Sequence, residues 1–266
     1  MSALLDLLEL APLQENSFRA PGHGPEGKRA FGGQFLAQSM AAAGRTVTEA
    51  ALPTSLHLQF LRGGDSGAVV DYDVERLYDG RTAMTRRVLA RQGGRIITAA
   101  TVSFAVPSAG PEHGHRGALP DDPDTVPATG PAGPAPGLPL DELDIRIVDS
   151  GTGADFLRRL YWRTTIPVPA DPLLNTCLAL LVTDVYLIDA GLRVHGHSMK
   201  ERTHRSGTTD AAVWFHRPVH ADHWNLLESR SPAAARGRAV VTAQLMSADG
   251  ATYATAVQEG LIAARE

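Results

Sequence analysis

Residues 54–105 read TSLHLQFLRGGDSGAVVDYDVERLYDGRTAMTRRVLARQGGRIITAATVSFA, and this stretch decides the fold. It contains four strand-like runs bounded by turn residues, at 54–62, 69–78, 82–92 and 95–105. The turn signals between them are Gly63-Gly64-Asp65, Asp79-Gly80 and Gly93-Gly94. Consecutive strands joined by short turns predict an antiparallel sheet.

The same landmarks recur in the second half of the chain, 155 residues further on. The equivalent pairs are Arg62 with Arg217, Arg81 with Arg236, and Val102 with Val257. Four more strand-like runs accompany them, at 209–217, 223–230, 236–247 and 251–263. Because several landmarks keep one offset, we interpret the chain as an internal duplication.

A helix precedes the strands in each half, at 31–43 in the first and roughly at 173–187 in the second. A run of antiparallel strands needs a cover for one face, and one helix per half can supply it. The predicted fold class is therefore α+β. We expect a double hot-dog, meaning two tandem repeats in which an antiparallel sheet wraps around a central helix.

Proline and glycine concentrate between the two halves. Nine of the eighteen prolines and six glycines fall between residues 107 and 139, where no apolar period survives. We therefore expect an N-terminal hot-dog repeat at 1–106, a Pro/Gly-rich linker at 107–140, and a C-terminal repeat at 141–266. We also expect the linker to be mobile around 130–136.

Composition limits the choice of compartment and partner. Hydrophobic residues make up 43% and charged residues 20% of the 266 residues, which favours a packed core. A net charge of −4 without a Lys/Arg block argues against nucleic acid and anionic membranes as main partners. The N-terminal stretch carries Asp6 and Glu9 and predicts no membrane span. A single cysteine suits a reducing cytoplasm.

Four segments carry a resemblance to a known family. They are Phe31-Gly-Gly-Gln-Phe-Leu-Ala-Gln38, Phe60-Leu-Arg-Gly-Gly-Asp65, Trp214-Phe-His-Arg-Pro218, and Ala235-Arg-Gly237 with Val257-Gln-Glu-Gly260. In this order, across nearly the whole chain, they resemble the acyl-CoA thioesterase II family. The resemblance implies a double hot-dog fold and hydrolysis of acyl-CoA to free fatty acid and CoA. It also implies a homodimer or homotetramer.

The resemblance places the family's catalytic residues on Asp184, Thr208 and Gln258. The chain departs from the family pattern at Ala211, where His is frequent, and at Thr209, where an apolar residue is usual. Thr208 and Thr209 are therefore rivals for one role, and we count Thr209 among the substrate-binding residues.

The residues themselves favour the same chemistry. On a 3.6-residue period, Asp184 lies on the core-facing stripe of the second predicted helix. A buried carboxylate is costly unless hydrogen-bonded, so it is either a structural cap or a functional group. Strand alternation puts Thr208 on the side of Asp210 and Ala212, and Gln258 on a side of small residues. A carboxylate, a hydroxyl and an amide can together orient a water and take its proton.

Gly32 and Gly33 open the first predicted helix. Helix N-termini carry unpaired N–H groups and a partial positive charge, so we expect these glycines to bind substrate and stabilise an oxyanion. The alternative is close packing of helix on sheet. The phosphates of CoA need cations, and the sequence does not choose among Arg62, Arg81, Arg86, Arg87 and Arg163.

Two other functions stay open from sequence alone. One is a hot-dog dehydratase or hydratase, which would use a His with an Asp, and no matching His motif occurs. The other is a non-catalytic module that binds acyl-CoA or an acyl carrier. No metal is predicted, because the histidine pairs lack a third ligand. No cofactor is predicted either, because the glycine-rich segment 22–28 lacks the following Ser or Thr of a phosphate loop.

Overall fold

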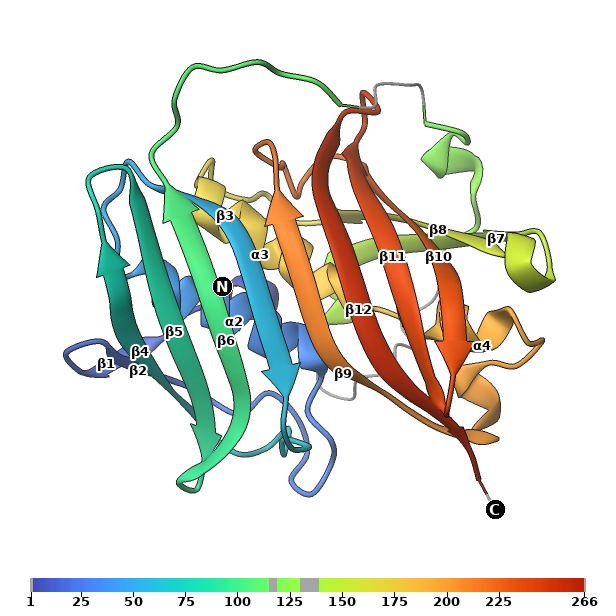
Figure 1. The fold of residues 1–266 in the computed structure, drawn as a ribbon, viewed down its shortest axis with the longest axis horizontal. Coiled ribbons are helices and arrows are strands. Elements are labelled where there is room, and N and C mark those ends of the chain that lie inside the picture. The colour runs from blue at the N-terminus through green and yellow to red at the C-terminus, as the bar shows by residue number, and fades with distance from the viewer. Residues whose placement is uncertain (1, 115–118, 130–138, 266) are drawn as a thin grey trace.

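A twelve-stranded antiparallel sheet dominates the computed structural model, which describes residues 2–114, 119–129 and 139–265 (Figure 1). The strand order is β1-β2-β4-β5-β6-β3-β9-β12-β11-β10-β8-β7. The strands are β1 Ala11–Gln14, β2 Ser17–Ala20, β3 Leu52–Phe60, β4 Val70–Asp79, β5 Ala83–Gln92, β6 Arg95–Ala105, β7 Leu143–Ser150, β8 Leu157–Thr164, β9 His204–Phe215, β10 Asn225–Ala235, β11 Arg238–Ser247 and β12 Thr252–Ala264.

The eight predicted strand runs correspond to β3–β6 and β9–β12, with ends shifted by a few residues. The Gly93-Gly94 turn between β5 and β6 has φ angles of 53° and 77°, a left-handed geometry that suits a tight hairpin and favours glycine. The sequence analysis missed the outer strands β1, β2, β7 and β8. Strands β1 and β2 are short, but the alternation of Leu143, Ile145 and Ile147 could have revealed β7.

Strands related by the 155-residue offset occupy equivalent places on either side of the sheet centre. Strands β3 and β9 pair there, side by side in the middle of Figure 1. In this pair His57 lies opposite Ala212, which is its own equivalent 155 residues on. The two halves are therefore joined through their equivalent strands, in one continuous sheet.

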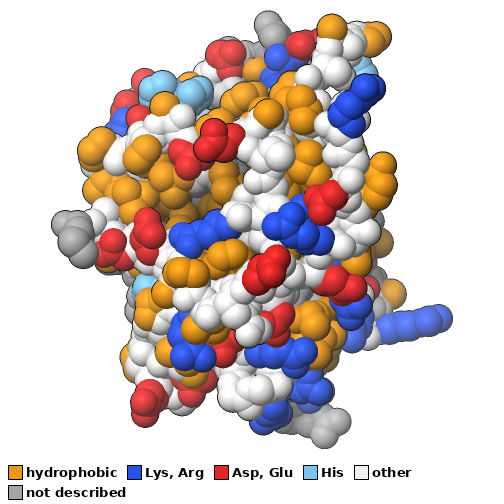
Figure 2. All heavy atoms as spheres, turned by 90° about the vertical axis from the view of Figure 1, so that its left-hand side faces the viewer, with side chains coloured by type: hydrophobic (Ala, Val, Ile, Leu, Met, Phe, Trp, Pro, Cys, Tyr) orange, Lys and Arg blue, Asp and Glu red, His pale blue; other side chains and the backbone are white. Residues whose placement is uncertain are grey.

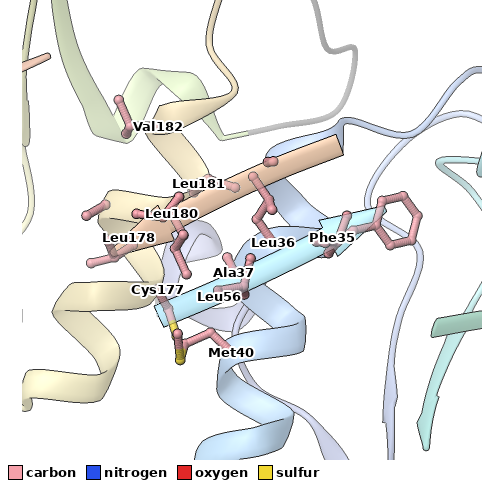
Figure 3. Packing of buried hydrophobic residues seen from close by; sticks show 14 of the residues in the cluster. Phe35, Leu36, Ala37, Met40, Leu56, Cys177, Leu178, Leu180, Leu181 and Val182 are labelled. Atoms are coloured by element: carbon pink, nitrogen blue, oxygen red, sulfur yellow. The ribbon is translucent and has the colours of Figure 1, made fainter. Parts of the chain in front are cut away.

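Two helices, α2 Gly32–Gly44 and α3 Pro172–Thr183, lie on one face of the sheet and pack against each other (Figures 1 and 3). Their contact is apolar, with Leu36 and Met40 of α2 facing Cys177 and Leu181 of α3. Each fully buried leucine contributes roughly 1.5–3 kcal/mol, so this core fixes how the helices sit on the sheet. The shorter helices are α1 Ala3–Asp6, α4 Asp189–Arg193, η1 Pro123–Thr125, η2 Leu140–Glu142, η3 Gly153–Asp155 and η4 Met199–Glu201.

The second predicted helix is shorter than expected, and this corrects the position of Asp184. Helix α3 ends at Thr183, so Asp184 is its C-cap residue rather than a residue within the helix. The cause is local: Tyr186 has a left-handed φ of 57°, which no α-helix can continue. The carboxylate therefore projects from a helix end, where the backbone leaves room beside it.

The surface agrees with a modest net charge. On the face seen in Figure 2, basic and acidic side chains are interspersed with hydrophobic ones. No helix of the described residues is long and apolar enough to cross a membrane. The expected mobility at 130–136 concerns residues outside the described ranges.

Candidate active site

A pocket of about 150 Å³ lies where the N-terminus of α2, the end of α3 and the first part of β9 meet. Its apolar wall includes Phe31, Phe35, Phe60, Ile188 and Met199. Asp184 and Thr208 line the same pocket, as does Gly32. An apolar wall with a few converging polar groups is typical of a small-molecule site.

The structure brings the three predicted catalytic residues together. The hydroxyl of Thr208 donates to Oδ1 of Asp184 at 2.9 Å, and its oxygen lies 3.4 Å from Oε1 of Gln258. Gln258 is only 1% exposed. Its amide is close enough to lower the pKa of Asp184, although Nε2 makes no hydrogen bond of normal geometry within the described part of the chain. The amide nitrogen of Gln258 is thus a buried donor near the carboxylate that lacks a hydrogen bond of normal geometry.

A β-bulge decides which threonine enters the site. Between β9 and β12, Asp210 pairs with Glu259 and Thr208 with Gly260, so Thr209 is an extra residue. A bulge shifts the alternation of a strand by one residue. Thr208 therefore faces Asp184, whereas the expected common side with Asp210 and Ala212 is wrong.

Thr209 lies away from the pocket. Its hydroxyl lies 3.1 Å from both the carbonyl and Oε1 of Glu259, and it also accepts from Arg238 at 3.2 Å. These contacts hold it in a polar cluster that does not line the cavity. The geometry thus favours Thr208 over Thr209 as the partner of Asp184.

Burial raises the pKa of Asp184 to about 6, from an ordinary value of 3.8. The carboxylate keeps some accessible surface because it lines the pocket, but protein surrounds it on nearly every side. The hydrogen bond from Thr208, the nearby amide of Gln258, the nearby N–H of Gly33 and the charge of Arg29 all oppose this rise. The result is a carboxylate that is ionised near neutral pH yet basic enough to accept a proton.

Asp184 also approaches the N-terminus of helix α2 from the other half of the chain. The residue before the helix, Phe31, offers no side-chain cap, and the Gly33 N–H lies close enough to the Asp184 carboxylate to help lower its pKa. A Cβ at Gly32 would lie 2.4 Å from Oδ2 of Asp184, and one at Gly33 would lie 2.3 Å from the Leu181 carbonyl oxygen. Gly32 thus permits access to the carboxylate, while Gly33 permits the close approach of α2 to α3.

A buried network of charged side chains fixes the segment that follows Asp184 and forms part of the pocket wall. Arg158 donates twice to Asp149, at 2.8 Å each, and its Nη1 donates to Asp189 at 2.9 Å and to the Tyr186 carbonyl at 3.3 Å. Asp189 in turn accepts from the backbone N–H of Met199 at 2.6 Å. Tyr186 and Met199 both line the pocket, so this network fixes its shape.

The structure distinguishes among the arginines considered for binding the phosphates of CoA. Arg62 lines the pocket, whereas Arg86 is fully buried and bonded to Asp79. Arg163 pairs with Asp144 at 3.5 Å and stacks on an indole. The sequence analysis missed Arg29, which also lines the pocket. Across residues 2–114, 119–129 and 139–265, no three His, Cys, Asp or Glu side chains form a metal-ligating group.

Family models give an independent view of the chain. The acyl-CoA thioesterase N-terminal domain matches residues 19–105, and the acyl-CoA thioesterase C-terminal domain matches residues 119–262. The chain belongs to the acyl-CoA thioesterase family. Among relatives of this family, acyl-CoA thioesterase 2 of Haemophilus influenzae is 31% identical over 98% of this chain and 97% of its own length. Acyl-coenzyme A thioesterase 8 of Homo sapiens is 30% identical over 96% of this chain and 87% of its own length.

Solved structures support the same membership of the acyl-CoA thioesterase family. An acyl-CoA thioesterase II from Mycobacterium marinum has a TM-score of 0.84 at 30% identity and covers 99% of this chain and 98% of its own. A hot-dog protein from Alicyclobacillus acidocaldarius has a TM-score of 0.81 at 19% identity, with full coverage of both chains, and shows the fold alone. The hot-dog fold predicted from sequence is confirmed at this level.

Proposed function

We propose that this acyl-CoA thioesterase hydrolyses acyl-CoA with a water molecule held by Asp184, Thr208 and Gln258. The observation that carries the proposal is the 2.9 Å hydrogen bond from Thr208 to a pocket-lining carboxylate whose pKa is about 6. Thioesters are already activated acyl groups, so water suffices as the nucleophile and no acyl-enzyme is needed.

The two carboxylate oxygens of Asp184 have different roles in this mechanism. Oδ1 accepts the Thr208 hydroxyl, while Oδ2 lies against Gly32 at the pocket wall and is the oxygen that takes a proton from water. The water attacks the thioester carbonyl carbon, the C–S bond breaks, and the proton passes from Asp184 to the departing CoA thiolate. Nε2 of Gln258, which makes no hydrogen bond of normal geometry, and the N-terminus of α2 at Gly32 would stabilise the oxyanion, while the Gly33 N–H faces Asp184.

The proposed base gives a definite pH dependence. A general base works only when ionised, and the folded-state pKa of Asp184 is about 6. We therefore expect kcat/KM to fall as the pH drops through about 6 and to be level above about pH 7. Initial rates at fixed ionic strength from pH 4.5 to 8.5 measure this limb. An acid limb near pH 4, the range of an ordinary carboxyl, would contradict the burial argument.

The bulge provides a matched pair of variants. Thr208→Val removes a hydrogen bond to a charged group, worth about 1.5–3 kcal/mol, so kcat/KM should fall roughly tenfold to a hundredfold. Thr209→Val, an identical change one residue away, should leave kcat/KM within about twofold. Both are measured by CoA release from one acyl-CoA. The reverse ranking would assign the role to Thr209.

We infer a double hot-dog, with repeats at 1–106 and 141–266 joined by the linker at 107–140, because equivalent strands take equivalent places in the sheet order. In this arrangement α2 and α3 are the central helices, and the site lies between repeats. We further propose a cytoplasmic homodimer or homotetramer, and a monomeric mass in light scattering would contradict the assembly.

A further inference from the structure

The side chain of Arg29, from the segment before α2, reaches the pocket that Asp184 and Thr208 line. A Cβ placed on Gly207 would lie 2.9 Å from Nη2 and 3.2 Å from Nη1 of Arg29. The guanidinium therefore fills the space that a side chain at residue 207 would occupy, one residue from Thr208. Both Arg29 and Gly207 line the pocket. Gly207 has no positive φ, so its lack of a side chain serves this close approach and not a backbone turn.

The Arg29 guanidinium is available to a ligand. It forms no hydrogen bond or ion pair with any residue that the structure describes. Its charge acts on Asp184 through space, without a direct contact. By contrast, Arg62, the second arginine of the pocket, donates Nη1 to the Ile96 carbonyl at 2.8 Å. Arg29 thus presents a planar set of N–H donors in the pocket that Asp184 and Thr208 line.

The position of Arg29 indicates which part of the ligand it meets. The phosphates of CoA are separated from the thioester by the long pantetheine arm, whereas Arg29 lines the same pocket as Asp184 and Thr208 and lies against Gly207. Hydrolysis leaves a fatty acid at that point, and its carboxyl group is ionised at neutral pH. A second carboxylate next to Asp184 is unfavourable unless a cation compensates it. Guanidinium matches carboxylate in a bidentate geometry.

We infer that Arg29 binds the carboxylate of the fatty acid product through its guanidinium. The inference rests on the proposed site at Asp184 and adds to it the residue that recognises the product. It also explains why a glycine stands at position 207, since any larger residue would displace the guanidinium.

Titration calorimetry with octanoate and 1-octanol tests the inference without turnover. Wild type should bind octanoate, and Arg29→Gln should weaken octanoate about tenfold or more while leaving 1-octanol unchanged, because only the carboxylate loses a charged hydrogen bond. Gly207→Ala should also weaken octanoate, since it displaces the guanidinium without removing it. Arg205→Gln, an exposed arginine of β9 outside the pocket, is the control and should match wild type.

Three results would overturn the inference. Equal loss of octanoate and 1-octanol would show a structural effect, and an unchanged octanoate affinity in Arg29→Gln would show no contact. Weakened binding of free CoA with unchanged octanoate would move Arg29 to the phosphate end of the substrate. Because these are binding measurements, they stay separate from the activity test of Asp184, which alone decides the proposed mechanism.

Discussion

Replacing Asp184 with Asn is expected to lower kcat for acyl-CoA hydrolysis by about a hundredfold or more, within the range of 10²–10⁴ that a general base contributes. Asn has nearly the same shape, but a non-basic amide nitrogen replaces the carboxylate oxygen Oδ2 that takes the proton. The measurement follows free CoA with a thiol reagent across acyl-CoAs from C2 to C18. It gives the acyl-chain preference of the wild-type enzyme at the same time.

Asp210→Asn is the matched control for this variant. Asp210 is two residues from Thr208 on β9, but its carboxylate accepts the Glu259 N–H at 3.3 Å and does not line the pocket. Its activity should stay near that of wild type. Burial disfavours ionised Asp184, so Asp184→Asn should remain folded above pH 7, which thermal unfolding checks. Hydrolysis by Asp184→Asn at the wild-type rate would contradict the mechanism. No hydrolysis by folded wild type would favour a non-catalytic module that binds acyl-CoA.

Arg158→Met is expected to lower the free energy of unfolding by about 3–5 kcal/mol, the usual cost of removing one partner from a buried ion pair. The side chain of Arg158 is 7% exposed, and that of its partner Asp189 is 5% exposed. Without the guanidinium, Asp189 keeps its hydrogen bond from Met199 but loses its counter-charge. Urea unfolding of the two proteins, analysed with a common slope, measures the difference.

Arg19→Met is the control that shows whether the loss of stability in Arg158→Met comes from burial of the ion pair or from its bidentate geometry. Arg19 binds Asp71 through two hydrogen bonds of 2.6 and 2.8 Å, a bidentate pair like that of Arg158 with Asp149, but on the surface. Solvent screens such pairs, so this variant should lose far less stability. Equal losses in both variants would mean that the buried network adds nothing beyond an ordinary surface pair.

Eight of the twelve strands could be predicted from sequence, as could the meeting of Asp184, Thr208 and Gln258, because the signals for these features are local. Turn glycines such as Gly93 and Gly94 mark hairpins, and the motif around Gln258 lies within one strand. The bulge at Thr209 could not be predicted in this way. It depends on how β9 registers against β12, and that register is a property of two strands.

Contacts between charged residues that are far apart in the chain could not be predicted from the sequence, for a related reason. Arg158 and Asp189 lie 31 residues apart, and each looks like an ordinary surface charge until the fold buries both. Arg29 was missed because its loop precedes the motif at Phe31 and because the glycine that accommodates it, Gly207, lies in the other half. The end of α3 before Asp184 depended on the left-handed Tyr186, an unusual conformation for tyrosine.

The bulge in β9 has a counterpart in β3, where Pro53 pairs with Phe104, Ser55 pairs with Ser103, and Thr54 is extra. At the 155-residue offset Thr54 is the equivalent of Thr209, so both halves of the chain carry a bulge at the same place. The proposed reacting groups are not duplicated, since Pro53 and Ser103 stand at the positions equivalent to Thr208 and Gln258. We therefore expect one active site per chain, although the chain has two equivalent bulges. A tight inhibitor of the site should bind with a stoichiometry of one molecule per chain.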